Sequence, residues 1–227
     1  MTVGVRWHDS AAACGAELDG VIRSVEAYYT GKLTEYGATP LGVDWSCQAT
    51  QWLRFVQLLK ICRFDTAISL NDLGCGYGEL ATFLRQRYPQ AAVDYLGIDL
   101  SSAMVQRARR RHRGEPTTRF AVGRSCRRQA DYSVASGIMN VMLSYPLPLW
   151  ESFVRSILVD MHCHSHKGFA VNFCASRRAD LRPDELYCSA PDLWVRYCET
   201  QFDCSVEVIS DYGLNEYTLL VTRKNRS

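Results

Sequence analysis

The sequence lacks any stretch that would direct it into a membrane or out of the cell. No apolar run approaches the roughly 18 residues that a membrane-spanning helix needs. Residues 1 to 20 also lack the basic start and the apolar run of a secretion signal. We therefore expect a cytoplasmic protein with no membrane partner.

The usual spacing of metal ligands is absent as well, although the chain has ten cysteines. No two of them form the C-x-x-C pair typical of a zinc site. In the segment MHCHSH, residues 161–166, the histidines are two apart, and side chains at that spacing diverge on a helix. We expect reduced, structural thiols and no metal site.

A strong charge of either sign is missing too, because the formal net charge is only +2. No strong field therefore draws the whole chain to nucleic acid. The local exception is the arginine-rich run 107–113, which the pattern places at the end of a helix, where positive charge favours the helix dipole. We do not favour a nucleic-acid partner, but Arg119, Arg124, Arg127 and Arg128 add local basic charge and keep RNA methylation as a minor alternative. The sequence leaves the oligomeric state open.

Two amphipathic helices are predicted in the first part of the chain. Apolar residues recur at helical spacing over 17–36 and again over 46–62, and a loop with proline and glycine separates the two patterns. We predict an N-terminal helical extension over 1–65 and one α/β domain over 66–227.

A strand, a glycine turn and a helix follow one another in the centre of the sequence. An apolar run at 67–70 leads into Asp72-Leu73-Gly74-Cys75-Gly76-Tyr77-Gly78, and a helical pattern begins at Glu79. Glycines let a backbone pass close to a ligand, and the following helix N-terminus offers free N–H groups. A second apolar run ends at Asp99, where dinucleotide-type folds place a carboxylate that binds ribose.

The spacing of the turn distinguishes two cofactors. The pattern is G-x-G-x-G rather than G-x-G-x-x-G, and the acidic Asp72 stands two residues before the first glycine. That carboxylate would repel a pyrophosphate and attract the ammonium and sulfonium groups of S-adenosylmethionine. The residues favour S-adenosylmethionine over NAD.

Strands and helices alternate through the rest of the chain. Strands are predicted near 67–73, 92–98, 118–122, 132–136, 168–174, 204–210 and 216–222, with helices at 78–88, 101–112, 147–163 and 184–200. This alternation predicts a parallel sheet with helices on both faces. Residues 211–215 are too short for a parallel crossover, so the last strand must be antiparallel.

These motifs, in this order, resemble the class I S-adenosylmethionine-dependent methyltransferases. The likeness runs through the glycine turn, Gly97 to Ser101, Phe120 to Gly123 and Asp131 to Gly137. It implies a Rossmann-like seven-stranded sheet with an antiparallel last strand, covered by an N-terminal helical lid. It also implies that the cofactor contacts Asp72, Gly74, Cys75, Gly76, Gly78, Asp99, Leu100, Met104 and Ser136. Where the family commonly has an acidic residue near adenine, this chain has Arg124.

The predicted lid has residues suited to a ligand. Tyr28, Tyr29 and Trp45 are either helix core or the wall of an acceptor pocket, where aromatic rings attract a methylsulfonium. Arg54 is either a solvated charge or a bidentate partner of the methionine carboxylate.

The sequence identifies the catalytic residues less clearly than the cofactor-binding residues. Transfer of a methyl group from sulfonium needs alignment above all, and a base only where the acceptor loses a proton. Tyr145, Tyr212 and Asn172 are the candidates at the expected cofactor edge, and Asn172 and Tyr212 are as suited to holding loops as to chemistry. We predict transfer to oxygen, nitrogen or carbon of a small aromatic or apolar molecule. An RNA methyltransferase and a non-catalytic binding protein are the alternatives.

Overall fold

The computed structural model describes residues 8–175 and 186–224, with side chains from residue 15 onward. The chain begins with the long helix α1 (His8–Tyr36), the short helix η1 (Pro40–Val43), α2 (Gln48–Leu58) and η2 (Leu59–Ile61). Alternating strands and helices follow: β1 (Ile68–Leu73), α3 (Glu79–Arg87), β2 (Val93–Asp99), α4 (Ser102–Arg111), β3 (Thr118–Val122), β4 (Ala130–Ala135), α5 (Leu147–Cys163) and β5 (Ser165–Ala175). The last elements are β6 (Cys188–Ser189), α6 (Pro191–Phe202), β7 (Cys204–Ile209) and β8 (Glu216–Arg223).

The strands form one sheet in the order β3-β2-β1-β4-β5-β8-β7. Its first five strands are parallel, and β8 is antiparallel to both β5 and β7. The predicted seven-stranded sheet with an antiparallel last strand is confirmed. In addition, the two-residue strand β6 pairs with the end of β5.

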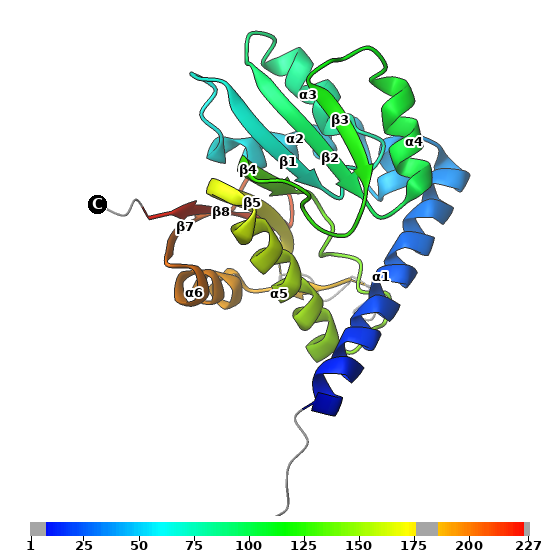
Figure 1. Cartoon of the computed structure of the whole chain (residues 1–227), viewed down its shortest axis with the longest axis vertical. Coiled ribbons are helices and arrows are strands. Elements are labelled where there is room, and N and C mark those ends of the chain that lie inside the picture. Colours follow the sequence, from blue (N-terminus) through cyan, green and yellow to red (C-terminus); the bar gives the residue numbers. More distant parts are fainter. Residues whose placement is uncertain (1–7, 176–185, 225–227) are drawn as a thin grey trace, which may run out of the picture.

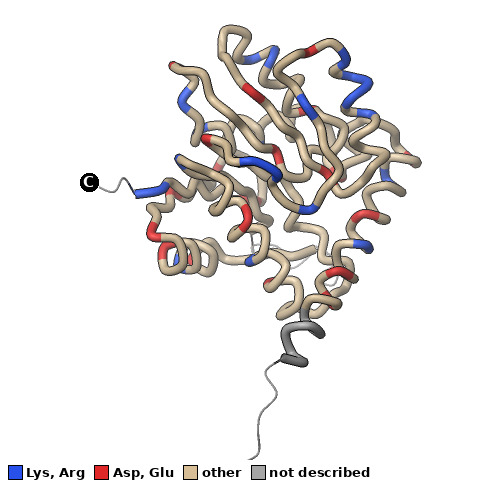
Figure 2. The backbone as a smooth tube through the Cα atoms, viewed as in Figure 1, with Lys and Arg blue, Asp and Glu red and all other residues tan. Residues whose placement is uncertain are grey.

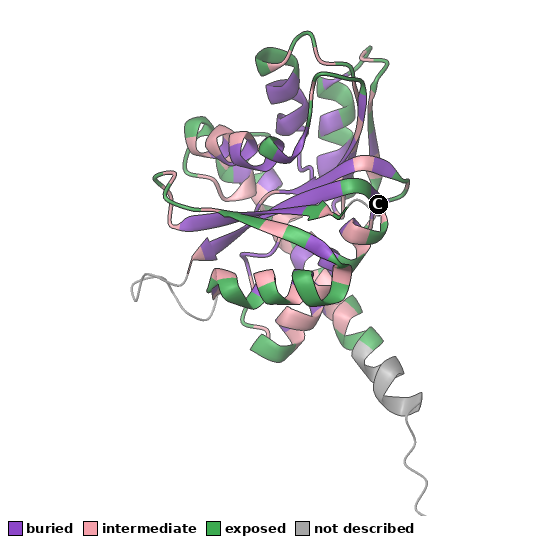
Figure 3. Ribbon diagram, turned by 90° about the vertical axis from the view of Figure 1, so that its left-hand side faces the viewer, coloured by how far each residue is buried: buried purple, intermediate pink, exposed green. Residues whose placement is uncertain are grey.

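Helices cover both faces of the sheet, and the strands alternate between two apolar cores. Phe169, Val171 and Leu219 point into a core with α1, α5 and α6. Their neighbours Ala170 and Leu220 point into a second core with α2, α3 and α4. Figure 3 shows the resulting three layers, with the purple buried strands in the middle.

The helix predicted over 184–200 is wrong at its start. The structure begins α6 at Pro191, and β6 precedes it; residues 184 and 185 lie outside the described residues. Proline favours the first position of a helix and pushes the residue before it into extended conformation, which explains the later start.

The first helix lies across the edge of the sheet where the parallel strands end. In Figure 1 the arrows of β1 to β3 point towards α1, which runs diagonally past them. Three side-chain contacts join α1 to this edge: Asp19 to Arg124 at 2.6 Å, Ser24 to Tyr145 at 2.7 Å and Thr30 to Ser101 at 2.7 Å. The sheet edge and α1 therefore enclose space between them.

Candidate active site

A cavity opens beneath α1 at the carboxyl ends of β1, β2 and β4. It contains about 1010 Å³ of empty space, counting the part open to solvent. Ligands of open α/β sheets bind at this edge. Eight of the ten predicted cofactor residues line the cavity, namely Asp72, Gly74, Cys75, Gly76, Asp99, Leu100, Met104 and Ser136. Gly78 and Arg54 lie outside its lining.

The glycine turn after β1 forms the floor. Gly74 and Gly76 have φ angles of +77° and +53°, which glycine adopts without strain. A Cβ on Gly74 would lie 2.1 Å from Cγ2 of Ile138, so no side chain fits there. Gly78 instead is the N-cap of α3 and packs on His112, whose Nε2 lies 2.9 Å from the Gly78 carbonyl oxygen.

Asp72, near the end of β1, is almost fully buried, with 3% of its surface exposed. The Tyr95 hydroxyl donates a hydrogen bond to its Oδ2. Burial raises the pKa of Asp72 to about 7, and the hydrogen bond from Tyr95 only partly opposes that rise. The carboxyl is therefore poorly compensated within the protein, and a cationic ligand group would stabilise its ionised form.

Asp99, at the end of β2, fixes the geometry of two turns. Its Oδ2 accepts the N–H of Gly76 at 2.8 Å, and its Oδ1 accepts the N–H of Ser101 at 2.9 Å. Burial raises the pKa of Asp99 to about 6, while these two backbone hydrogen bonds lower it. The N-cap of α4 is Ser101, whose Oγ accepts the N–H of Met104 at 3.3 Å.

The charged groups around the cavity are mostly acidic. Its described lining contains the carboxylates of Asp72, Asp99, Glu26 and Glu79, and the one cation Arg124, which pairs with Asp19 on α1. Glu79 is itself paired with Arg111 at 2.6 Å, which leaves the carboxylates of Asp72, Asp99 and Glu26. The charge of Glu26 contributes to the raised pKa of Asp99. The cavity therefore favours a ligand that carries positive charge.

One buried polar atom at the cavity lacks a partner. Ser136 Oγ, just beyond β4, has no hydrogen bond within the described part of the chain. A buried hydroxyl without a partner costs free energy, and a polar ligand group would remove that cost. The glycine floor, the acidic lining and this hydroxyl together fit S-adenosylmethionine, whose sulfonium and ammonium groups are cationic and whose ribose is polar.

The remaining walls are apolar and aromatic. They come from α1, the end of η1, the turn after β4, and α5. Of the aromatic residues singled out from the sequence, Tyr29 and Trp45 line the cavity, whereas Tyr28 packs edge-on against Tyr29.

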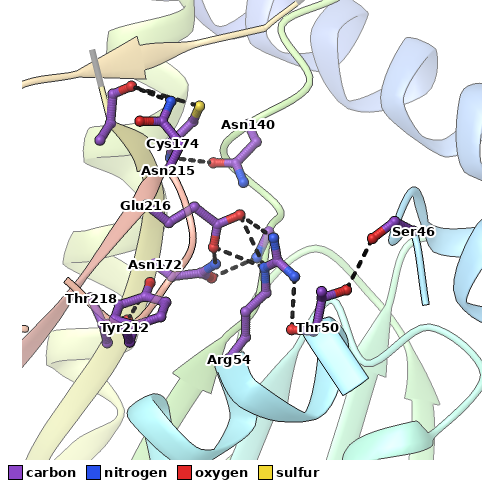
Figure 4. Close-up of polar contacts among 12 residues, drawn as sticks. Ser46, Thr50, Arg54, Asn140, Asn172, Cys174, Tyr212, Asn215, Glu216 and Thr218 are labelled. Carbon is purple, nitrogen blue, oxygen red and sulfur yellow. Dashed lines mark hydrogen bonds and ion pairs between the residues drawn. The ribbon is translucent and has the colours of Figure 1, made fainter. Parts of the chain in front are cut away.

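Behind Trp45, Arg54 is already engaged by protein groups. The Trp45 ring lies 3.8 Å from the Arg54 guanidinium carbon. Arg54 Nε donates to Glu216 Oε2 at 2.8 Å, and a shorter ion pair joins Nη2 to the other carboxylate oxygen. Arg54 Nη1 donates to the Thr50 carbonyl oxygen at 2.8 Å. Figure 4 shows this buried pair linking α2 to β8.

Asn172 extends the same network to the cavity wall. Its Nδ2 donates to Glu216 Oε2 at 2.9 Å, and its Oδ1 accepts the N–H of Gly137 at 2.8 Å. Gly137 lines the cavity with a φ of +77°, and a Cβ there would lie 2.4 Å from Trp45. Asn172 thus holds the turn after β4 in place (Figure 4).

The other two catalytic candidates also lie outside the cavity lining. The Tyr145 hydroxyl contacts Ser24 of α1 at 2.7 Å. The Tyr212 hydroxyl lies 3.2 Å from Thr218 Oγ1, and burial raises the pKa of Tyr212 to about 12. Both residues were expected at the cofactor edge of the sheet. In the structure their hydroxyl groups contact Ser24 and Thr218.

Sequence reasoning missed three polar residues of the cavity, Glu26, Gln51 and Glu79. Glu79 accepts hydrogen bonds from Trp52 Nε1 at 2.9 Å and Gln48 Nε2 at 3.1 Å. The position of Glu79 directly after the glycine turn could have identified it as a cavity residue from the sequence. Glu26 and Gln51 stand within amphipathic helical patterns, where a polar residue ordinarily faces solvent, so no local signal marks them.

The arginine-rich run is in contact with the cavity wall through Arg111, although none of its residues lines the cavity. Arg111 Nη1 pairs with Glu79 Oε2 at 2.6 Å, and its guanidinium carbon lies 5.4 Å from the centre of the Tyr77 ring. Figure 2 shows the basic residues of α4 gathered towards one end of this helix.

The histidines of the segment 161–166 do not line the cavity. His162 stacks on Phe202, and His164 Nδ1 lies 2.8 Å from the Asp160 carbonyl oxygen. Within the described ranges, no helix is both long and apolar enough to cross a lipid bilayer.

The known proteins that this chain resembles are described as methyltransferases. Residues 71–159 match the family described as Methyltransferase domain. Over 167 residues the chain is 36% identical to a Mycobacterium tuberculosis protein provisionally named methyltransferase Rv1506c, a match covering 73% of this chain and 99% of that protein.

Solved structures share the fold. Phosphoethanolamine N-methyltransferase 1 of Haemonchus contortus, in complex with phosphoethanolamine and S-adenosylhomocysteine, matches with a TM-score of 0.64 at 11% identity, over 91% of this chain and 50% of that one. Magnesium protoporphyrin IX methyltransferase of Synechocystis PCC 6803, with bound S-adenosylhomocysteine, matches with a TM-score of 0.53 at 13% identity, over 99% and 90% of the two chains.

Proposed function

The chain belongs to the class I S-adenosylmethionine-dependent methyltransferases, and from that premise we propose that it methylates oxygen, nitrogen or carbon of a small aromatic or apolar molecule. S-Adenosylmethionine is its methyl donor, and when bound it supplies an electrophilic methyl group on a positively charged sulfur. The protein's own residues must then hold the donor and the acceptor and exclude water.

The polar side of the cavity is suited to the donor. In our proposal Asp99 accepts from the ribose hydroxyls while its backbone partners keep it oriented. Asp72 compensates the positive charge of the ligand, and Ser136 Oγ provides a hydrogen-bonding group that no described residue of the protein uses. The glycine floor allows the ligand to approach the backbone.

The apolar side of the cavity is suited to the acceptor, and this observation carries the proposal. Ile22 and Val25 of α1, Phe153 and Ile157 of α5, and Ile138 from the turn after β4 all line the same space. An acceptor that buries apolar surface there gains about 25 cal/mol per Å². No basic side chain other than Arg124 lines the described cavity, which disfavours a phosphate-rich acceptor.

The position of α1 supports a small acceptor over a polymer. The contacts of Asp19, Ser24 and Thr30 join this helix to residues that follow β3, β4 and β2. We propose that α1 and α2 act as the lid over the cofactor. The named acceptors of the two solved relatives, phosphoethanolamine and magnesium protoporphyrin IX, are themselves small molecules of different chemistry.

The catalytic candidates act, in this proposal, as positioning residues. Asn172 orients Gly137 at the cavity wall, and Tyr145 holds α1 through Ser24. Tyr212 supports β8 through Thr218. Alignment of the acceptor, the methyl group and the sulfur then supplies most of the rate enhancement.

The test is transfer of a radiolabelled methyl group from S-adenosylmethionine to fractionated small molecules and, separately, to RNA. Ile157→Arg places a charge in the apolar half, and Val159→Arg places the same charge on the exposed face of α5. We expect label in a small apolar product with the wild type and with Val159→Arg. Ile157→Arg should lose transfer and retain binding of S-adenosylhomocysteine. Label found in RNA, or equal transfer by both variants, would refute the small-molecule proposal.

A further inference from the structure

Two cysteines lie side by side at the end of the sheet, outside the cavity lining. Cys174 is in β5 and Cys188 is in β6, and the two residues are register partners in the parallel pairing of these strands. Their sulfur atoms are 2.8 Å apart. A disulfide bond measures about 2.05 Å, so less than an ångström separates the thiols from bonding distance.

The backbone geometry suits such a bond. Adjacent strands lie about 4.8 Å apart, which falls within the roughly 4.4–6.8 Å that separates the Cα atoms of bonded cysteines. The end of β5 is also well fixed, because the N–H of Cys174 donates to Asn140 Oδ1 at 3.1 Å and Cys174 pairs in register with Glu216 of β8. The sulfurs can therefore approach without rebuilding the sheet.

The surroundings make one sulfur accessible and one buried. Cys188 is half-buried, whereas Cys174 is 8% exposed. Burial raises the pKa of the Cys174 thiol to about 12, and its contact with Cys188 adds to that rise. A reagent in solution therefore meets Cys188 first.

We propose that Cys174 and Cys188 form a dithiol that is oxidised reversibly to a disulfide by a low-molecular-weight disulfide such as oxidised glutathione. The Cys188 thiolate attacks one sulfur of the small disulfide, and one small thiol leaves with the electron pair and takes up a proton. Deprotonated Cys174 then attacks the Cys188 sulfur and releases the second small thiol. The protein loses two hydrogens and the small disulfide gains them.

This modification departs from the expectation that all the cysteines are reduced, structural thiols. The bond would close a loop of 15 residues, from 174 to 188, and join β6 covalently to β5. Cross-linking a loop removes conformational freedom from the unfolded chain. The oxidised protein should therefore melt several degrees above the reduced protein, and dithiothreitol should reverse the change.

The first experiment treats the reduced, native protein with oxidised glutathione and measures intact mass and linked peptides. We expect a loss of two hydrogens without a retained glutathione, and one peptide pair joining 174 to 188. Cys188→Ser should lose this linkage, whereas Cys47→Ser, which removes an exposed cysteine, should keep it. A bond between other cysteines, or a full count of free thiols after treatment, would overturn the proposal.

A second experiment needs no variant. Phenylarsine oxide bridges two neighbouring thiols, so the reduced wild type should lose two titratable thiols for each arsenic bound. Peptide mapping should find Cys174 and Cys188 protected from alkylation, while the isolated, exposed Cys163 stays reactive. Equal alkylation of all three would show that the pair is not close in solution and would refute the proposal.

Discussion

Replacing Asp72 by asparagine should stabilise the ligand-free protein above pH 7 and weaken binding of S-adenosylmethionine. Burial raises the pKa of this carboxyl from 3.8 to about 7. Since one pKa unit corresponds to about 1.36 kcal/mol, keeping Asp72 ionised in the folded protein costs on the order of 4 kcal/mol. Asparagine removes the charge and keeps an oxygen that accepts the Tyr95 hydrogen bond.

The sign of the pH dependence follows from proton binding. The unfolded chain releases the Asp72 proton near pH 4 and the folded protein near pH 7, so the folded state binds more protons between these values. The free energy of unfolding therefore falls as pH rises through this window and levels off above it. Asp99, with a pKa raised to about 6, contributes in the same direction, so Asp72→Asn should remove only part of the slope.

Thermal unfolding between pH 5 and 8 measures this effect. An upper bound of about 4 kcal/mol corresponds to a rise of roughly 8–16 °C in Tm at pH 8 for a chain of this size. In calorimetric titration the same variant should bind S-adenosylmethionine about tenfold more weakly, because one charge-assisted interaction is lost.

Asp131→Asn is the matched control. Burial raises the pKa of Asp131, but hydrogen bonds from Ser69 and Lys167 outweigh it and hold the pKa below its usual value. Removing that charge should lower Tm and leave binding of S-adenosylmethionine unchanged. If Asp72→Asn lowered Tm at pH 8 as Asp131→Asn does, the reasoning about an uncompensated buried carboxylate would be refuted.

Two further predictions concern the framework of the site. Arg54→Leu should lower the free energy of unfolding by about 3–5 kcal/mol, because it leaves the buried Glu216 carboxylate without its cationic partner. Adding Glu216→Leu should recover most of that loss in a double-mutant cycle of chemical denaturation, and additive losses would show that the pair is not coupled. Gly74→Ala should abolish binding of S-adenosylhomocysteine in a calorimetric titration, because its Cβ would displace Ile138 and the residue needs a positive φ; binding at wild-type affinity would contradict the role given to the turn.

The arrangement of the sheet could be predicted because its signals are local. Apolar runs, the glycine turn at 74–78 and the short connection at 211–215 each depend on a few neighbouring residues. The strand at 118–122 and the helix at 147–163 have the predicted bounds. Asp72 and Asp99 were identified as cofactor residues from their sequence spacing to the glycine turn. That spacing places both carboxylates at the ends of neighbouring strands, on one edge of the sheet.

Pairings between distant segments could not be predicted. Arg54 and Glu216 are 162 residues apart, and each stands in a pattern where a charged side chain ordinarily faces solvent. Only the packing of α2 on β8 shows that Arg54 is buried and paired, and hence that it is not free to extend into the cavity. The contact between Cys174 and Cys188 likewise depends on the two-residue strand β6, which is too short to leave a pattern.

Titration of the wild type and of Asp99→Ala with S-adenosylhomocysteine tests the central claim most directly, namely that the cavity under α1 is the cofactor site. The account predicts one bound ligand per wild-type chain, and a stabilisation of about 2.7 kcal/mol at 100 times the dissociation constant. Asp99→Ala, folded by circular dichroism, should bind at least tenfold more weakly. Equal affinity in the two proteins, or no binding to the wild type, would contradict the assignment of this site.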